Sequence, residues 1–391
     1  MATLGYCTNV HAGATLHEAK EQLDRHATAV RRELGVEWLD IGLWLSARAV
    51  FELKEQDAGA ARLRAWLDER GLRVFTINGF PYGDFHAKRV KHAVYEPNWA
   101  NARRLLFSID LADLLVELIH DGRHEAGIST LPLGWRLSFS LEGCGSSVGL
   151  ASAQLEQFAR HAARLEERTG RCIHLDLEPE PGCMLDTSRD VTGFFDQVLR
   201  QRAGEPDLRR YIRVCHDTCH AAVMFEDQAN VLQAYRDAGV RVGKVQLSSA
   251  IECPSSDRAF RALRHFDEPV YLHQTCVLDG AGERHLFTDL DRAFDHAPDG
   301  LWRTHFHVPL FADRLGQGGV LGTTQADVVS CLAAIRPEDG ITDFEAETYA
   351  WGALPLDHRM ASLAEGIAQE LRWARDRMTE CGIADALGAA R

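Results

Sequence analysis

Short apolar runs alternate with amphipathic helical patterns along the whole chain, and this alternation limits the folds that the chain can adopt. Strand-length runs separated by helices are typical of βα units, in which parallel strands form one sheet that helices cover. We predict a single (β/α)8 TIM barrel, an α/β fold with elaborated βα loops. Its expected strands are residues 3–8, 38–45, 73–77, 126–131, 172–177, 211–216, 242–247 and 341–347.

The segments between these runs carry apolar residues at steps of three and four, which is the spacing of an amphipathic helix. Several end at a glycine, such as Gly71 and Gly170, where a left-handed helix cap precedes the next strand. The clearest helical segments are residues 60–70, 101–119, 153–168 and 191–202.

The length of 391 residues, with 46% hydrophobic residues, suits one large barrel or two ordinary domains. Because no long linker rich in proline, glycine or serine divides the sequence, we expect one domain over residues 1–391. The expected insertions are residues 79–98, 134–149 and 248–340. Two apolar runs within the last insertion, 269–274 and 302–308, are expected to form a hairpin-like elaboration of one long loop.

Charge and cysteine usage disfavour several kinds of partner. The 43 basic and 57 acidic residues give a net charge of -14, which disfavours nucleic acid and anionic membranes. The sequence has no secretion-signal pattern and no apolar stretch of the roughly 20 residues that a membrane helix needs. Its ten cysteines lack zinc-ribbon spacing and are expected to be free thiols. We therefore expect a cytoplasmic protein that binds a small polar metabolite, as a monomer or a homo-oligomer.

In a (β/α)8 barrel the active site lies at the C-terminal ends of the strands, so polar residues that end a strand are the most informative. Glu178 follows an expected strand and is suited to hold a hard cation or to act as a general base; a solvated acidic loop is the alternative. Asp217 and His220 follow the next strand. Their carboxylate and imidazole converge within one turn and form a mixed oxygen and nitrogen set that suits Zn, Mn or Co.

Three further side chains extend this candidate metal site. Gln246, near the end of its strand, offers a carbonyl oxygen to a metal or hydrogen-bonds a substrate, and a satisfied buried glutamine is the alternative. His305 and His307 share one face if their segment is extended. Such a pair is typical of metal ligands, and polar residues that line a substrate pocket are the alternative.

The last expected strand places Asp343, Glu345 and Glu347 on one face. Inward carboxylates repel one another unless a cation or shared protons lie among them. Glu347 is nearest the C-terminal mouth and is our choice for the ligand, with Glu345 behind it.

These motifs resemble known proteins. The stretch Asp217-Thr218-Cys219-His220 resembles a signature of the endonuclease IV family, and the order of candidate ligands resembles that of the xylose-isomerase-like TIM-barrel superfamily. Over nearly its full length the chain resembles the EboE family, metabolite-traffic proteins from bacterial gene clusters linked to export or maturation of small secondary metabolites. The segments that carry this resemblance are Gly5-Tyr6-Cys7-Thr8-Asn9, Leu45-Ser46-Ala47-Arg48, Thr76-Ile77-Asn78-Gly79-Phe80-Pro81-Tyr82-Gly83, Ser129-Thr130-Leu131-Pro132, Glu178-Pro179-Glu180-Pro181-Gly182 and Glu347-Thr348-Tyr349.

The superfamily resemblance implies one or more divalent ions held by Glu178, Asp217 and Glu347, with Gln246 at a position where endonuclease IV carries histidine. His220, His305 and His307 resemble the residues that hold a further zinc ion in endonuclease IV. The resemblance therefore implies a second metal site formed by these three histidines. The histidines that a full trinuclear site needs on earlier strands are not apparent in the sequence.

The first functional hypothesis is an isomerase or epimerase that acts on a small sugar, polyol or cyclitol-type metabolite. Glu178 and Glu347 would exchange a proton as base and acid. The expected substrate-binding residues are His220, His86, Asn78 and Arg48. The alternatives are a non-catalytic metabolite carrier, as the traffic label implies, and an endonuclease IV-like phosphodiesterase, which the overall charge disfavours.

Overall fold

The structure is a computed structural model and describes residues 2–141, 144–199, 207–349, 351, 354 and 360–383. Eight parallel strands form a closed barrel in the order β1-β14-β7-β6-β5-β4-β3-β2, so the predicted TIM barrel is confirmed. The expected strand positions differ from the observed ones by only a few residues at each end. The strands are β1 (Thr3–Cys7), β2 (Leu39–Trp44), β3 (Leu72–Asn78), β4 (Glu125–Thr130), β5 (Cys172–Leu177), β6 (Ile212–Asp217), β7 (Val242–Leu247) and β14 (Asp343–Ala346).

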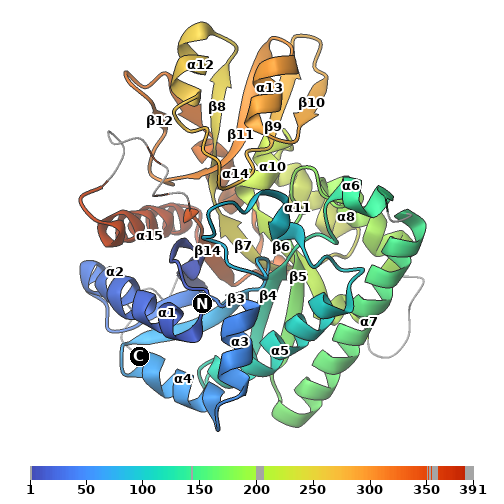
Figure 1. The fold of residues 1–391 in the computed structure, drawn as a ribbon, viewed down its shortest axis with the longest axis vertical. Helices are drawn as coiled ribbons and strands as arrows, with labels where there is room; N and C mark the ends of the chain where they lie inside the picture. The colour runs from blue at the N-terminus through green and yellow to red at the C-terminus, as the bar shows by residue number, and fades with distance from the viewer. Residues whose placement is uncertain are drawn as a thin grey trace.

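Helices surround the barrel (Figure 1) and bury their apolar stripes against the outward side chains of the strands. They are α1 (Leu16–Gln22), α2 (Thr28–Leu34), α3 (Ala47–Lys54), α4 (Gly59–Asp68), α5 (Ala102–Leu118), α6 (Arg136–Leu141), α7 (Cys144–Thr169), α8 (Ser188–Phe194), α9 (Leu208–Tyr211), α10 (Thr218–Val223), α11 (Gln228–Asp237), α14 (Gln325–Ala334) and α15 (Leu363–Glu380).

Two helical expectations need correction. The insertion expected at residues 134–149 contains α6 and the start of α7, so much of it is helical rather than an irregular loop. The helix expected at 191–202 is instead α8 followed by a π-helical turn, Phe195–Leu199, and its last residues lie outside the described part of the chain.

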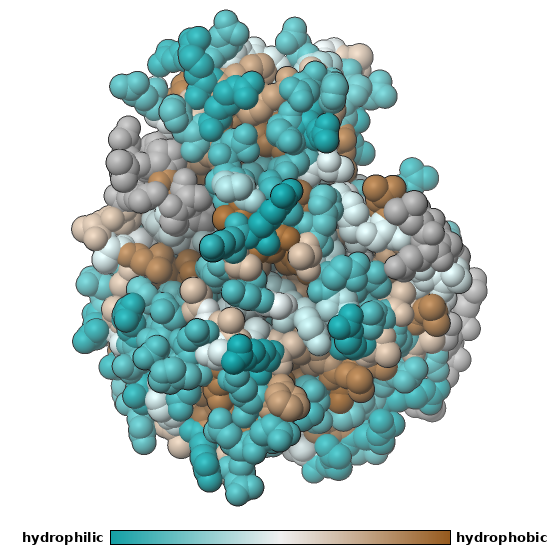
Figure 2. All heavy atoms as spheres, in the orientation of Figure 1, coloured by the Kyte–Doolittle hydropathy of each residue, from teal (hydrophilic) through white to brown (hydrophobic). Residues whose placement is uncertain are grey.

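The connection from β7 to β14 carries a second, antiparallel sheet of six strands in the order β10-β9-β11-β8-β13-β12, and Figure 1 shows its upper part projecting beyond the barrel. A separate hydrophobic cluster that includes Phe266, Trp302 and Phe306 supports it. Most of the face in Figure 2 is hydrophilic, and apolar atoms show between this sheet and the barrel. The elements are β8 (Ser249–Pro254), α12 (Asp257–Leu263), β9 (Thr275–Asp279), β10 (Arg284–Phe287), α13 (Leu290–His296), β11 (Gly300–Val308), β12 (Arg314–Leu315) and β13 (Leu321–Thr323).

The hairpin-like elaboration expected here is therefore a larger structure than predicted. The run at 302–308 lies in β11 as a strand, whereas the run at 269–274 precedes β9 and is not a strand. The Glu268 carboxylate accepts hydrogen bonds from the backbone N–H groups of Val270 and Tyr271, both at 2.8 Å. Because these donors are satisfied by a side chain, they are not available to a strand ladder.

The inside of the barrel is polar near its axis. Lys244 on β7 and Glu345 on β14 form an ion pair in which both side chains are fully buried. Gly42 on β2 makes room for it, since a Cβ at that position would overlap the Glu345 carboxylate. Asp343 pairs with Arg123. Asp343 and Glu345 thus each pair with a cation, whereas Glu347 lines the pocket, and its role as a metal ligand stays a prediction.

Candidate metal centre and pocket

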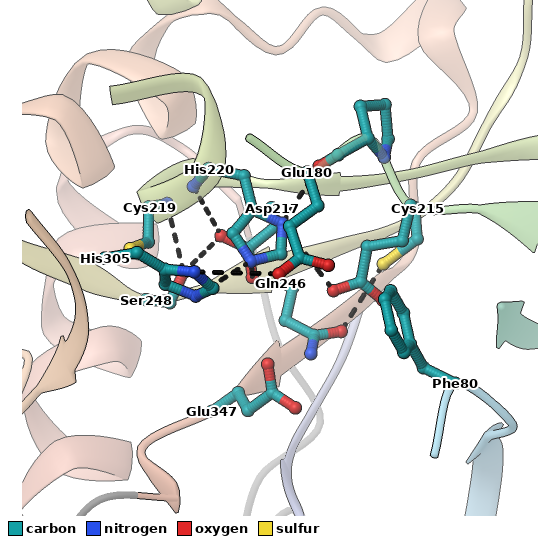
Figure 3. A network of polar contacts seen from close by, with 12 residues as sticks. Phe80, Glu180, Cys215, Asp217, Cys219, His220, Gln246, Ser248, His305 and Glu347 are labelled. Atoms are coloured by element: carbon teal, nitrogen blue, oxygen red, sulfur yellow. Dashed lines mark hydrogen bonds and ion pairs between the residues drawn. The ribbon is translucent and has the colours of Figure 1, made fainter. Parts of the chain in front are cut away.

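Three imidazoles from two parts of the fold meet at the barrel mouth. His220 lies in the first turn of α10, and His305 and His307 lie on one face of β11. The Nε2 atom of His305 is 3.2 Å from that of His220 and 3.1 Å from that of His307. All three residues are buried, and Figure 3 shows His220 and His305 pointing toward each other.

The hydrogen bonds of the Nδ1 atoms define the tautomer of each ring. His220 Nδ1 donates to the carbonyl of Pro179 at 2.9 Å, and His307 Nδ1 donates to that of Glu347 at 2.8 Å. His305 Nδ1 is 2.9 Å from Gln274 Oε1, an amide oxygen that can only accept. With every Nδ1 protonated, three Nε2 lone pairs face one another.

Facing lone pairs repel unless a proton or a cation lies between them. Burial, reinforced by the neighbouring His220 and His307, lowers the pKa of His305 well below its ordinary value, so this ring resists an extra proton. Zn–N bonds of about 2.0–2.1 Å place the nitrogens of a tetrahedral site about 3.3 Å apart. The measured separations of 3.1 and 3.2 Å are close to this value, so the residues fit a divalent ion.

Asp217 ends β6 and adds a carboxylate beside the imidazoles (Figure 3). Its Oδ1 accepts from Ser248 Oγ at 2.6 Å and from the backbone N–H of His220 at 3.0 Å. Its Oδ2 has no hydrogen-bond partner among the described residues and lies 4.0 Å from His220 Nε2. Burial raises the pKa of Asp217, whereas protonated forms of His220 and His307 and the Ser248 hydrogen bond lower it, and the net shift is downward.

Glu178 and Glu347 complete a carboxylate cluster with Asp217, in which one oxygen of each lies within 4.8 Å of the others. Burial, with Glu347 and Asp217 nearby, raises the pKa of Glu178 well above its ordinary value. Glu178 Oε2 has no hydrogen-bond partner among the described residues. Glu347 Oε1 accepts from Asn9 Nδ2 at 2.6 Å and from Asn78 Nδ2 at 3.1 Å. The two glutamates therefore differ, because Glu178 is poised to bind a proton and Glu347 is held by amide donors.

Gln246 lies among these groups, but its carbonyl oxygen already accepts from the thiol of Cys215 at 3.4 Å. Its amide nitrogen has no partner among the described residues. In this arrangement Gln246 presents a donor to the site, and its role as a metal ligand stays a prediction.

The other three expected substrate-binding residues differ in how close they lie to the site. Asn78 lines the pocket and donates to Glu347, and its role in substrate binding stays a prediction. His86 donates from Nε2 to the carbonyl of Asn9 at 2.7 Å, so in this structure it supports the loop that carries Asn9. Arg48 is not brought to the site, because its 68% exposed side chain pairs with Glu52 one turn along α3.

Sequence reasoning missed four residues of the site. Asn9 follows β1 and reaches Glu347. Glu180 accepts from Tyr95 at 2.7 Å and from Gln274 at 2.9 Å, and Gln274 in turn orients His305. Glu180 could have been predicted from the sequence, because it lies in the same Glu-Pro-Glu-Pro segment at a strand end as Glu178. Tyr95 and Gln274 lie in insertions and have no local signal.

The histidines and glutamates of the candidate metal centre line a pocket. One wall is polar and contains the three histidines with Glu178, Glu180 and Glu347. The rest of the lining is apolar and aromatic and consists of Phe80, Pro81, Phe85, Val90, Val94, Tyr95, Tyr271, Leu272 and Tyr349.

Comparison with solved structures finds proteins with a similar barrel fold. A xylose isomerase-like TIM-barrel protein from Mycobacterium smegmatis, solved in complex with magnesium, has a TM-score of 0.52 at 12% sequence identity, with 98% of each chain covered. The TIM-barrel fold of the chain is therefore similar to that of this protein. No protein-family model and no curated protein matches it.

Two other solved structures are similar at a lower level. An IolI protein with a bound zinc atom has a TM-score of 0.48 at 12% identity, over 97% of this chain and 99% of that one. A probable 3-DHS dehydratase, AsbF from Bacillus anthracis, has a TM-score of 0.47 at 14% identity, over 95% and 98%. Within the described residues, no helix has both the length and the apolar character needed to cross a membrane.

Proposed function

We propose that this protein is a metal-dependent isomerase or epimerase that acts on a small sugar, polyol or cyclitol-type metabolite. The observation that carries the proposal is the convergence of three Nε2 lone pairs, from His220, His305 and His307, beside a pair of glutamates with different environments. Paired carboxylates whose environments differ are the usual arrangement for an acid and a base in proton transfer.

In this proposal His220, His305, His307 and Asp217 hold a Zn, Mn or Co ion. When bound, such an ion supplies a Lewis acid that polarises a substrate carbonyl and makes a neighbouring proton easier to remove. The magnesium complex of the similar M. smegmatis protein supports a divalent ion in this fold. The cluster of Glu178, Asp217 and Glu347 is the candidate position for a second ion.

Glu178 and Glu347 then divide the proton transfer between them. The raised pKa of Glu178 suits a group that takes a proton from carbon and returns it. Amide donors from Asn9 and Asn78 hold Glu347 in place, and Glu347 gives or accepts the second proton. Asn78 also offers its polar atoms to substrate oxygens from the pocket wall.

The alternatives predict different behaviour. A carrier would bind the metabolite without exchanging its hydrogens, and Glu178→Gln would leave its affinity unchanged. An endonuclease IV-like phosphodiesterase would bind a polyanion, which three glutamates on the pocket wall would repel.

The cellular setting is part of the proposal. We infer an EboE-type role in a secondary-metabolite pathway, and a cytoplasmic location that agrees with nine described cysteines that are all free. We also infer one functional domain, because the barrel supplies His220 and the inserted sheet supplies His305 and His307 to the same cluster.

The test is solvent-deuterium exchange in protein loaded with Zn, Mn or Co, using a panel of ketoses and inososes as probes. We expect one probe to take up deuterium with the wild type. Glu178→Gln should lower the exchange rate at least about 100-fold, the range of general acid-base catalysis, while the ion at the histidine cluster stays bound. The matched control is Glu167→Gln, an exposed position on α7.

Two results would contradict the proposal. If the protein takes up none of the three metals, the Lewis acid that the proposal requires is absent. Binding of a probe without any exchange, with equal affinity in Glu178→Gln, identifies a carrier.

A further inference from the structure

The apolar wall begins directly at the metal cluster. The ring of Tyr349 lies 4.7 Å from that of His307, measured between ring centroids. Tyr349 also lies 5.0 Å from Tyr271 and 5.4 Å from Phe85, and these two rings are 5.0 Å apart. Three mutually packed aromatic rings therefore continue the pocket away from the ligands.

Contacts between two insertions hold this wall in place. The backbone N–H groups of Val90 and Lys91 donate to the carbonyl of Val270 at 2.8 and 2.9 Å. The hydroxyl of Tyr271 donates to the carbonyl of Phe85 at 3.2 Å. Lys91 also pairs with Asp289 at 2.6 Å, and both of these side chains are largely buried. The wall is thus preformed by the barrel loop and the inserted segment together.

The packing of these rings has a consequence for the ligand. Phe85 is buried and lines the pocket together with Val90 and Leu272. A bare polyol has hydroxyl groups on every side, and those that face this wall would lose their hydrogen bonds to water without replacement. An alkyl or aryl group in the same place would instead bury apolar surface.

The polar wall sets the charge of the ligand. Glu178, Glu180 and Glu347 all line the pocket. A phosphorylated substrate would bring two negative charges toward these carboxylates, which is unfavourable in a buried setting.

We propose that the substrate is an uncharged polyhydroxylated compound that carries an apolar alkyl or aryl substituent, with its oxygens at the metal cluster and the substituent against Phe85, Tyr271 and Tyr349. This inference rests on the proposed function, since it uses the same pocket and ion. It excludes sugar phosphates as the preferred substrates.

The test uses a metal-binding head group, so that it does not depend on knowing the substrate. Acetohydroxamate and octanoylhydroxamate are titrated calorimetrically into zinc-loaded protein. We expect the longer compound to bind at least about tenfold more tightly, because each buried methylene contributes about fourfold. Tyr271→Ala and Phe85→Ser should each reduce this gain severalfold. Phe51→Ala, a change at a 63% exposed ring on α3, should leave it unchanged.

The outcomes separate the two proposals. Equal binding of both hydroxamates by the wild type overturns the apolar subsite and leaves the metal centre intact, and this comparison needs no variant to fold. Protein that binds zinc but holds a hexose phosphate more tightly than the parent hexose overturns the uncharged-substrate proposal. Protein that binds neither zinc nor either hydroxamate refutes the proposed function itself.

Discussion

His220 on the barrel and His305 on the inserted sheet face each other with their Nε2 atoms 3.2 Å apart, although 85 residues separate them in the sequence. Each ring is oriented by a hydrogen bond from its other nitrogen. Acceptors outside the ligand shell that orient histidines in this way are typical of metal sites. The cluster therefore joins two parts of the fold through the candidate ion.

The histidine cluster should determine metal content. We expect the wild type to retain about one Zn, Mn or Co per chain or more, measured by elemental analysis after dialysis. His305→Ala and His307→Ala should each release most of this metal. His17→Ala removes an exposed imidazole from α1 and should retain it. Wild-type protein that stays metal-free after growth with added metals would refute the site.

Gln274 should act as a positioning residue. Its amide oxygen accepts from His305 Nδ1, and its nitrogen donates to Glu180. Gln274→Leu should weaken zinc affinity about 10- to 100-fold, the usual effect of removing such a partner, in a competition titration with a chelator. Gln233→Leu on α11 is the control. Unchanged affinity in Gln274→Leu would show that His305 needs no such support.

The buried pair of Lys244 and Glu345 should be costly to break. Lys244→Met leaves the Glu345 carboxylate without its cation and should lower the free energy of unfolding by about 3–5 kcal/mol. Urea denaturation at pH 7 measures this loss. Adding Glu345→Gln to Lys244→Met should recover much of it, since the second change removes the uncompensated charge. Equal losses in the single and double variants would contradict this explanation.

Stability should also depend on pH through Glu370 of α15. Burial raises the pKa of Glu370 to about 7, although its carboxylate accepts from Thr348 Oγ1 at 2.6 Å and from the backbone N–H of Leu310 at 3.0 Å. The folded state therefore holds a proton that the unfolded chain releases near pH 4.5. Its contribution to stability is greatest below pH 4.5 and falls as the pH rises to about 7.

Glu370→Gln keeps an acceptor oxygen and removes the titration. Between pH 5 and 8 the wild type should lose up to about 3 kcal/mol of unfolding free energy relative to this variant. Urea denaturation across that pH range gives the difference. Glu380→Gln, at an exposed ion pair with Arg377, should follow the wild type. Parallel pH curves for Glu370→Gln and the wild type would mean that Glu370 is ionised in the fold.

The sequence alone determined the barrel and half of the site. Strand and helix periodicity is local, so alternating apolar runs predict βα units without knowledge of distant contacts. Parallel strands of a closed barrel end at one rim, which is why Glu178, Asp217 and Glu347 converge as expected. His220 follows Asp217 within one helical turn, so its position beside Asp217 could also be predicted from the local sequence.

Tertiary structure decided the rest. His305, Gln274 and the aromatic wall come from long insertions, whose placement depends on packing between segments far apart in the chain rather than on local pattern. The same is true of Asn9, which reaches Glu347 across 338 positions. Arg48 has the right chemistry for a substrate-binding residue, but it lies on the solvent side of its helix. Only the folded chain determines which polar side chains share a cavity, because burial and pairing are properties of neighbours in space.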